Sequence, residues 1–241
     1  MLLAPLAARA GDVVSMNLCT DDYLVLLAPE RIAALSPLAR DPSLSVVAAQ
    51  ARHLPWVRAD GEAVMNLHPS LVLAAPYGAQ TTVAVLEGLG VRIERIALAQ
   101  DFAAIRKETR RLAALLGVPA RGESLIAAMD QDLSGVRTGR KLRALALAPR
   151  GYAAGPGTLE DSVLRAAGLD DIGRGGRLGL EAILAARPQL LVVADAPGFP
   201  SLATDMLTHP ILAAIPRRAL PPALLACAGP WSAAAVAMLA R

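Results

Sequence analysis

The sequence contains few residues of the types that build metal sites, with three histidines and two cysteines among 241 residues. A zinc site of the kind that holds a transported or catalytic ion takes about three histidines and a carboxylate. His68 and His209 each precede a proline at a predicted helix end, which indicates a capping or surface role. We therefore predict no metal site and no resident cofactor.

The motifs of nucleotide-binding and hydrolytic enzymes are missing or incomplete. The segment Gly155-Pro-Gly157 follows a predicted strand and precedes a predicted helix, but it lacks the third glycine of a dinucleotide fingerprint. The spacing from Gly135 to Lys141 does not fit a P-loop, and no Gly-x-Ser-x-Gly elbow locates a nucleophile. We predict that the protein is not an enzyme. An enzyme acting on a nucleotide or a sugar is the alternative from another class.

Long apolar runs and blocks of like charge are also missing. Hydrophobic residues make up 54% of the chain, yet no run approaches the roughly 20 apolar residues that a membrane span needs. The net charge of +3 comes from scattered arginines, without the basic block or interleaved aromatic rings of nucleic-acid binders. These features predict a globular chain that is not embedded in a membrane and binds no nucleic acid.

The first ten residues are similar to the end of a secretory signal peptide. They are apolar and finish in Ala8-Arg9-Ala10, an A-x-A cleavage pattern, although the charged front of such a signal is missing. We expect residues 1–10 to be a signal remnant and the protein to be periplasmic; a short disordered N-terminus is the alternative. In an oxidising compartment Cys19 and Cys227 can pair, or they can be two buried thiols.

The chain contains an internal repeat, in which residues 181–193 echo residues 62–74. In each copy a glutamate (Glu62 or Glu181) begins a short helix, a proline ends it, and branched apolar residues follow as a strand buried on both faces. The repeat predicts two similar α/β lobes. A cleft between lobes is where a small molecule usually binds.

The spacing of apolar residues predicts alternating strands and helices. Strands are expected at residues 12–16, 32–36, 71–75, 91–97 and 142–148, with a polar loop at 17–22. Helices are expected at 22–27, 62–67, 81–89, 101–117, 120–136, 158–167 and 231–239, and the second repeat at 181–194. The helix at 120–136 would be about 25 Å long, enough to bridge two lobes. We expect an N-terminal lobe at 11–98, a helical segment at 99–141 and a C-terminal lobe at 142–241.

Aromatic residues make up 3% of the chain, and most of them fall where a cleft is expected. Ligands of parallel sheets bind beyond the carboxyl ends of the strands. Tyr23 and Phe102 have the spacing of helix-packing residues. The other five rings are predicted to face the cleft, with core packing at the sheet ends as the alternative: Tyr77, Tyr152 and Phe199, which follow predicted strands, and Trp56 and Trp231, which lie near Pro or Gly.

Five segments, in order along the chain, carry a family resemblance: residues 13–21, 29–32, 62–73, 155–159 and 180–188. From about residue 12 to its end the chain resembles the cobalamin- and siderophore-binding periplasmic proteins of ABC importers, and most of all the cobalamin-binding branch. The resemblance implies an α/β fold of two Rossmann-like lobes with mostly parallel sheets. A single long α-helix would join the lobes, with the ligand held between them and little hinge motion.

The resemblance also implies partners and site residues. Glu62 and Glu181 match the glutamates with which the family docks on basic pockets of the dimeric permease, one on each lobe. The same carboxylates can instead stabilise helix starts by about 0.3–1 kcal/mol, and the two roles are compatible. We expect a monomer that binds a small molecule. The predicted ligand-binding residues are Asn17, Cys19, Thr20, Arg40, Trp56, Tyr77, Arg150, Tyr152, Phe199 and Trp231.

The expected ligand is a corrinoid, with haem or a ferric siderophore as the alternatives. Cobalamin binders often carry a Ser-Pro segment where this chain has Asn17 to Asp22, and a tryptophan where it has Tyr77. Arg40 and Arg150 are candidates to bind carboxylate or catecholate oxygens. A histidine, Cys19 or Cys227 could serve as an axial ligand of a haem or corrinoid metal.

Overall fold

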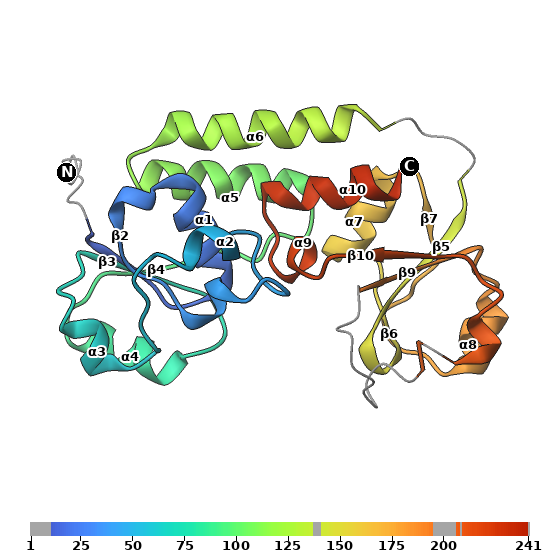
Figure 1. Ribbon diagram of the computed structural model, residues 1–241, viewed down its shortest axis with the longest axis horizontal. Coiled ribbons are helices and arrows are strands. Elements are labelled where there is room, and N and C mark those ends of the chain that lie inside the picture. The colour runs from blue at the N-terminus through green and yellow to red at the C-terminus, as the bar shows by residue number, and fades with distance from the viewer. Residues whose placement is uncertain (1–10, 137–140, 195–205, 208, 241) are drawn as a thin grey trace. The chain divides into compact units, whose positions relative to one another are not determined.

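The computed structural model describes residues 11–136, 141–194, 206, 207 and 209–240 (Figure 1). The predicted signal remnant at 1–10 and the predicted ligand contact Phe199 lie outside these residues. The chain forms two compact units: unit 1 runs to Ala99 and includes Ala103–Ile126, and unit 2 comprises Gln100–Phe102 and the chain from Ala127. The division falls within helix α6 (Pro119–Ser134), which is continuous across it.

Unit 1 is built on a four-stranded parallel sheet with the order β2-β1-β3-β4. Its strands are β1 (Val13–Ser15), β2 (Ile32–Ala34), β3 (Leu71–Ala74) and β4 (Ile93–Arg95). Every residue of β1 and β3 is buried, as expected for the central strands of a sheet covered on both faces. Because all four strands are parallel, their carboxyl ends lie at one edge of the sheet.

The helices of unit 1 correct one prediction from the sequence. Residues 17–22 are not a loop, because α1 (Leu18–Leu27) begins at Leu18, with Asn17 as its N-cap. The Asn17 side chain accepts a hydrogen bond of 2.9 Å from the backbone N–H of Cys19, which satisfies one of the free donors of a helix start. The remaining helices of unit 1 are α2 (Ala48–Ala51), α3 (Gly61–Met65), α4 (Gln80–Gly88) and α5 (Phe102–Leu115), with the short 3₁₀ turns η1 (Pro29–Arg31) and η2 (Pro37–Arg40).

Tyr23 and Phe102 are buried, as predicted for helix-packing residues. The hydroxyl of Tyr23 lies 3.2 Å from the hydroxyl of Thr109 on α5. This bond satisfies a polar group that would otherwise be costly in the core.

Unit 2 is built on a mixed sheet with the order β10-β9-β5-β6-β8, in which β7 also pairs with β5. Strands β10, β9, β5 and β7 are parallel, and β6 and β8 are antiparallel to their neighbours. The strands are β5 (Arg143–Ala148), β6 (Tyr152–Ala153), β7 (Asp170–Asp171), β8 (Gly176–Arg177), β9 (Leu190–Ala194) and β10 (Arg217–Leu220). The fold is therefore mixed α/β in both units, with mostly parallel pairing, as predicted.

The described helices of unit 2 are short. They are α7 (Leu159–Ala166), α8 (Leu180–Ala186), α9 (Ala223–Ala226) and α10 (Ala233–Leu239), with the 3₁₀ turns η3 (Pro149–Gly151), η4 (Pro210–Leu212) and η5 (Pro230–Ser232). Leu145 and Leu191 of the sheet pack with Ile183 of α8 in one buried cluster. Within the described ranges, no helix has both the length and the hydropathy that crossing a bilayer requires.

The internal repeat appears as a helix followed by a strand in each unit, α3 with β3 and α8 with β9. The two copies share one backbone detail: His68 and Arg187 both have a φ of 48° and both precede a proline. The helices end before the proline rather than at it, since α3 finishes at Met65 and α8 at Ala186. A proline disfavours the right-handed helical conformation in the residue before it, so neither helix continues through His68 or Arg187. Both residues are left-handed where the chain turns toward the strand.

Candidate ligand-binding site

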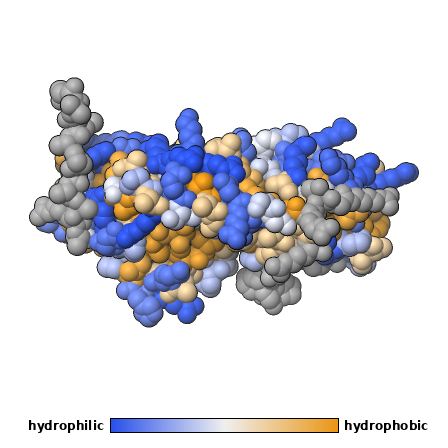
Figure 2. All heavy atoms as spheres, turned by 90° about the horizontal axis from the view of Figure 1, so that it is seen from above, coloured by the Kyte–Doolittle hydropathy of each residue, from blue (hydrophilic) through white to orange (hydrophobic). Residues whose placement is uncertain are grey.

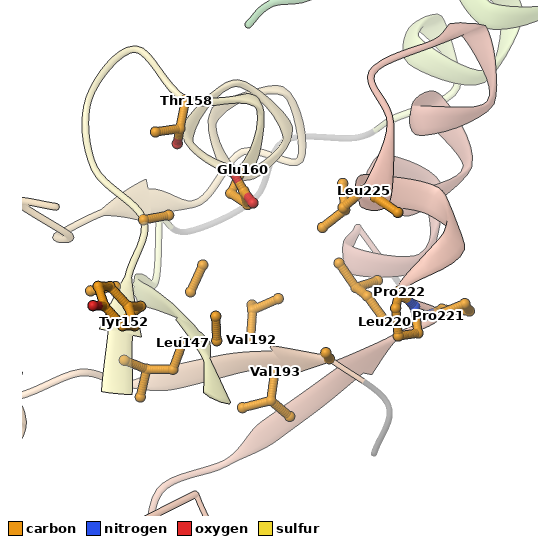
Figure 3. Close-up of a pocket in the computed structure, with 16 residues that line it drawn as sticks. Leu147, Tyr152, Thr158, Glu160, Val192, Val193, Leu220, Pro221, Pro222 and Leu225 are labelled. Atoms are coloured by element: carbon orange, nitrogen blue, oxygen red, sulfur yellow. The ribbon is translucent and has the colours of Figure 1, made fainter. Parts of the chain in front are cut away.

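A pocket of about 410 Å³ lies in unit 2, at the carboxyl ends of β5, β9 and β10 (Figure 3). Its volume falls in the range of small-molecule sites, and its position is the one where open parallel sheets bind ligands. Most of its wall is apolar. The lining residues are Ala146, Leu147, Ala148, Tyr152, Ala153, Ala154, Thr158, Glu160, Val192, Val193, Ala194, Leu220, Pro221, Pro222, Leu225 and Ala226.

Tyr152 is held at the pocket by a tight turn. After β5 the chain reverses through Arg150 and Gly151, which have φ values of 60° and 75°, and Tyr152 pairs with Ala148 on the way back. A side chain at Gly151 would begin 2.6 Å from the backbone oxygen of Leu178, so only glycine fits there. The Tyr152 side chain is left 54% exposed, which allows its ring to contact a ligand.

The polar wall of the pocket is the start of α7. Thr158 is the N-cap: its hydroxyl accepts from the backbone N–H of Asp161 at 3.2 Å and donates to the backbone oxygen of Gly155 at 2.9 Å. The carboxylate of Asp161 accepts from the N–H of Gly157 at 3.2 Å and pairs with Arg165 at 2.5 Å. The Gly155-Pro-Gly157 segment is therefore a turn whose Gly157 N–H is already satisfied by the Asp161 carboxylate at the start of α7.

Arg40 and Trp56 form a stacked pair in unit 1. The guanidinium of Arg40 lies 5.4 Å from the centroid of the Trp56 ring, within the range of a cation–π contact. It also donates to the backbone oxygens of Ala51 and Leu54, at 3.3 and 2.7 Å. Trp56 is itself bridged to Leu35 at the end of β2 and is 45% exposed. Arg40 thus holds the segment that presents the Trp56 ring.

Tyr77 lies at the same edge of the unit 1 sheet as Trp56. It follows β3, is 52% exposed and precedes Gly78, whose φ is 76°. The side chain of Gln80 closes this turn by donating to the backbone oxygens of Ala75 and Gly78, at 3.2 and 2.9 Å. Since β1 separates β2 from β3 in the sheet, Trp56 and Tyr77 flank the end of the central strand. Seen from above, a contiguous apolar area is exposed on the left half of the molecule (Figure 2).

Two carboxyl groups that we did not predict hold the loop after β2 onto α1. Asp21 accepts hydrogen bonds from the N–H and the hydroxyl of Ser36, at 3.0 and 2.5 Å. Asp22 accepts from the hydroxyl of Ser45 at 2.6 Å. Burial raises the pKa of Asp21 to about 7 and that of Asp22 to about 6, against the lowering effect of these hydrogen bonds. The signal in the sequence was a pair of adjacent acids beside a buried strand.

The predicted contacts in α1 have roles inside unit 1. Asn17 is the helix cap, and Thr20 is fully buried, with its hydroxyl 2.7 Å from that of Ser15. Cys19 and Cys227 are buried and neither is a free thiol. This overturns both the interpretation as two buried thiols and the role of either cysteine as a thiolate ligand to a metal.

The remaining predicted contacts lie in unit 2. Arg150 is exposed in the turn before Tyr152, and its backbone oxygen accepts from Arg177 at 3.0 Å. Trp231 is half-buried, and its indole N–H donates to the backbone oxygen of Cys227 at 3.0 Å. Among the predicted ligand contacts that lie in the described ranges, Tyr152 is the one that lines the pocket.

In the part of the chain that the structure describes, no three His, Cys, Asp or Glu side chains come together as a metal site would require. The ring nitrogen Nδ1 of His209 accepts from the N–H of Ile211 at 3.2 Å and caps η4, which confirms the predicted capping role. His68 precedes β3 and therefore lies at the amino edge of the unit 1 sheet.

Glu62 and Glu181 are exposed residues in the first turns of α3 and α8. The Asp60 side chain caps α3 by accepting from Ala63 at 2.8 Å, so Glu62 is not needed as the cap. Gly179 precedes α8 and offers no side chain. Both glutamates therefore present their carboxylates to solvent at equivalent points of the repeat.

Comparison with known proteins gives a family match over most of the chain. The model described as periplasmic binding protein matches residues 13–217. No curated protein sequence matches.

Solved structures share the fold at low sequence identity. A periplasmic heme binding protein from Pseudomonas aeruginosa is 24% identical with a TM-score of 0.75, over 96% of this chain and 92% of that one. The periplasmic heme binding protein HutB of Vibrio cholerae is 18% identical, with a TM-score of 0.75 over 93% and 95% of the two chains. The periplasmic vitamin B12 binding protein BtuF of Vibrio cholerae is 16% identical, with a TM-score of 0.66 over 96% and 95%.

Proposed function

The chain belongs to the periplasmic binding protein family, and from this we propose that it carries a metal-containing tetrapyrrole, a haem or a corrinoid, to an ABC importer. It is a solute-binding protein and not an enzyme. We place it in the periplasm, where such proteins capture their ligands.

The unit 2 pocket is the observation that carries the choice of ligand class. Its apolar wall and the exposed ring of Tyr152 suit the flat, apolar face of a tetrapyrrole, because stacking on an aromatic ring adds about 0.5–1.5 kcal/mol beyond area burial. Similar solved structures bind heme and vitamin B12, and this supports the same class of ligand. A hydrophilic ligand such as a sugar or a nucleotide phosphate would find few partners on this wall.

Tyrosine is the axial ligand that we propose if the cargo is a haem. Haem iron is held in proteins by His, Cys, Met or Tyr. Both cysteines are unavailable, His209 caps a turn and His68 lies at the amino edge of its sheet, which leaves the exposed His53 as the competing histidine. The phenols of Tyr77 and Tyr152 are exposed at the carboxyl ends of strands. We therefore expect the haem complex to have the absorption spectrum of a tyrosinate-ligated iron, and we expect one of the two variants, Tyr77→Phe or Tyr152→Phe, to lose that spectrum.

Calorimetric titration with haemin and with cyanocobalamin tests the ligand class and the pocket together. The blocking variant is Ala226→Trp, because Ala226 is an exposed lining residue at the end of α9, where an indole can fill the mouth without entering the core. The matched control is Ala128→Trp on the exposed face of α6. We expect binding of at least one tetrapyrrole by the wild type and by the control, and none by Ala226→Trp. A wild-type protein that binds neither compound contradicts the proposal.

A further inference from the structure

The unit 2 pocket carries a charge of one sign. Among its lining residues Glu160 is the only charged one, and none is Lys or Arg. A ligand group placed against this wall therefore meets a carboxylate without a compensating cation in the lining.

Glu160 is not used by the fold in the described part of the chain. It is half-buried in the first turn of α7 and makes no hydrogen bond or ion pair with the described residues. Its neighbour Asp161 caps the preceding turn and pairs with Arg165. In Figure 3 the Glu160 side chain points into the pocket, on the side opposite the strands. Of the two adjacent acids, one closes the helix start and the other faces the ligand space.

A carboxylate in the pocket wall determines which chemical groups at the edge of a ligand ring can lie against it. An ionised carboxylate only accepts hydrogen bonds, and a half-buried one beside apolar side chains is favoured by a donor that replaces lost water. An amide N–H can form such a charge-assisted bond. A ligand carboxylate cannot, and the two like charges repel at close range.

We propose that Glu160 determines the specificity of this pocket, favouring a macrocycle edge that bears hydrogen-bond donors, such as primary amides, over an edge that bears carboxylates. The inference rests on the proposed tetrapyrrole function and sharpens it. An amide-substituted corrinoid fits this rule, and a haem with two free propionates fits it less well.

Two ligands with one ring system isolate the effect of the edge: iron mesoporphyrin with its two propionates, and the same compound with both converted to primary amides. Affinities are measured at pH 8 for the wild type, Glu160→Gln and the control Glu181→Gln. Gln keeps the shape of Glu without its charge, and Glu181 is a first-turn glutamate outside the pocket lining.

We expect the wild type and Glu181→Gln to bind the diamide about tenfold more tightly than the diacid, and Glu160→Gln to bind the two within about threefold, chiefly by binding the diacid better. Thermal unfolding of Glu160→Gln should match the wild type, because no internal partner is lost. Equal affinities in the wild type, or an unchanged preference in Glu160→Gln, overturn the role of Glu160 while leaving the tetrapyrrole function standing. Failure of the wild type to bind either iron mesoporphyrin overturns the role of Glu160 in porphyrin selection, and failure to bind cyanocobalamin as well overturns the tetrapyrrole function.

Discussion

The side chain of Arg40 makes three contacts with one segment of unit 1, two with backbone oxygens and one with the face of Trp56. A hydrogen bond to a charged group contributes about 1.5–3 kcal/mol, and an exposed cation–π contact about 0.5–1 kcal/mol. Arg40 is half-buried, so solvent weakens each contact. Its main effect is to fix where the Trp56 ring is presented.

We predict that Arg40→Met lowers the free energy of unfolding by about 1–3 kcal/mol, because it removes both backbone bonds and the stacked charge. Urea unfolding followed by the fluorescence of Trp56, in a Trp231→Phe background, measures this change. Arg52→Met is the control, since Arg52 is exposed nearby and its side chain has no partner among the described residues. Equal urea midpoints for Arg40→Met and Arg52→Met would show that the pair does not hold the segment.

Truncation of the exposed tyrosines should weaken ligand binding without unfolding the protein. Tyr77 and Tyr152 are 52% and 54% exposed, so Tyr77→Ala and Tyr152→Ala leave the core intact. We expect each to lose at least the roughly 0.5–1.5 kcal/mol of a stacked ring, measured calorimetrically with the tetrapyrrole that the wild type binds. Unchanged affinity in both variants would mean that neither ring touches the ligand.

Single residues could be located from the sequence where a local rule applies. Tyr77 and Tyr152 follow strands, and ligands bind at strand ends, so their exposure at the sheet edges was predictable. The partners of Arg40, Asp21 and Asp22 lie 11 to 23 residues away along the chain. No periodicity links such positions, and their contacts depend on how the loop after β2 folds back.

Helix α1 buries two neighbouring carboxyl groups in the core of unit 1. It carries Asp21 and Asp22, both fully buried, and one oxygen of Asp22 has no hydrogen-bond partner among the described residues. Burial raises the pKa values of these carboxyls to about 7 and about 6, above the roughly 3.9 of an unfolded aspartate. The folded protein therefore holds these protons more tightly than the unfolded chain does.

This difference predicts that stability increases as the pH falls from 8 to 5. A raised carboxyl pKa contributes stability that is complete below the unfolded pKa and is lost as the pH rises through the folded one. Asp171 in unit 2, whose pKa burial raises to about 6, acts in the same direction. Asp12 has the opposite effect on stability, but only in stronger acid. Burial raises its pKa, but the hydrogen bonds from Arg31 and Ser70 leave the pKa lowered overall.

Urea midpoints at pH 8 and pH 5 measure the effect, and Asp22→Asn is the variant that removes one titrating group. We expect a higher midpoint at pH 5 in the wild type and a smaller difference between the two pH values in Asp22→Asn. A midpoint that is lower at pH 5 in the wild type would contradict the assigned burial effect.

The longer elements were predictable because their apolar spacing extends over several turns or a full buried strand. Helices α5 and α6 and strands β3, β5 and β9 lie within a few residues of the predicted ranges. Strands β6, β7 and β8 have two residues each, and a run of two residues shows no period. Strands β6 and β7 form because β5 offers backbone partners, and β8 forms on β6, which is a tertiary effect.

At the scale of the whole molecule, the repeat gives two units with equivalent interior strands, β3 and β9, each preceded by a helix with a glutamate in its first turn. The family match over residues 13–217 spans both copies. The repeat and the family resemblance thus led from the sequence to the two α/β units. The identity of the ligand depends on the pocket lining, which is drawn from five separate stretches of unit 2 and could not be assembled from the sequence.

We propose that Glu62 and Glu181 dock the protein on a dimeric permease, one subunit to each glutamate. Exposed charges of this kind set encounter and register and weaken with salt. The double variant Glu62→Lys with Glu181→Lys should therefore abolish uptake in reconstituted vesicles while leaving ligand affinity unchanged. Asp132→Lys with Asp170→Lys is the control, because these carboxylates are also exposed and have no side-chain partner in the described chain. Uptake at the wild-type rate by Glu62→Lys with Glu181→Lys would show that the two glutamates do not dock the protein on the permease and act only at the starts of their helices.

The central claim, that the protein binds a tetrapyrrole, is tested most directly by equilibrium dialysis of the purified chain. Haemin, cyanocobalamin and ferrichrome are supplied at equal concentrations, and the retained compound is identified by its absorption spectrum. We predict that a tetrapyrrole is retained at about one molecule per chain and that ferrichrome is not. Retention of ferrichrome alone, or of none of the three compounds, would contradict the claim.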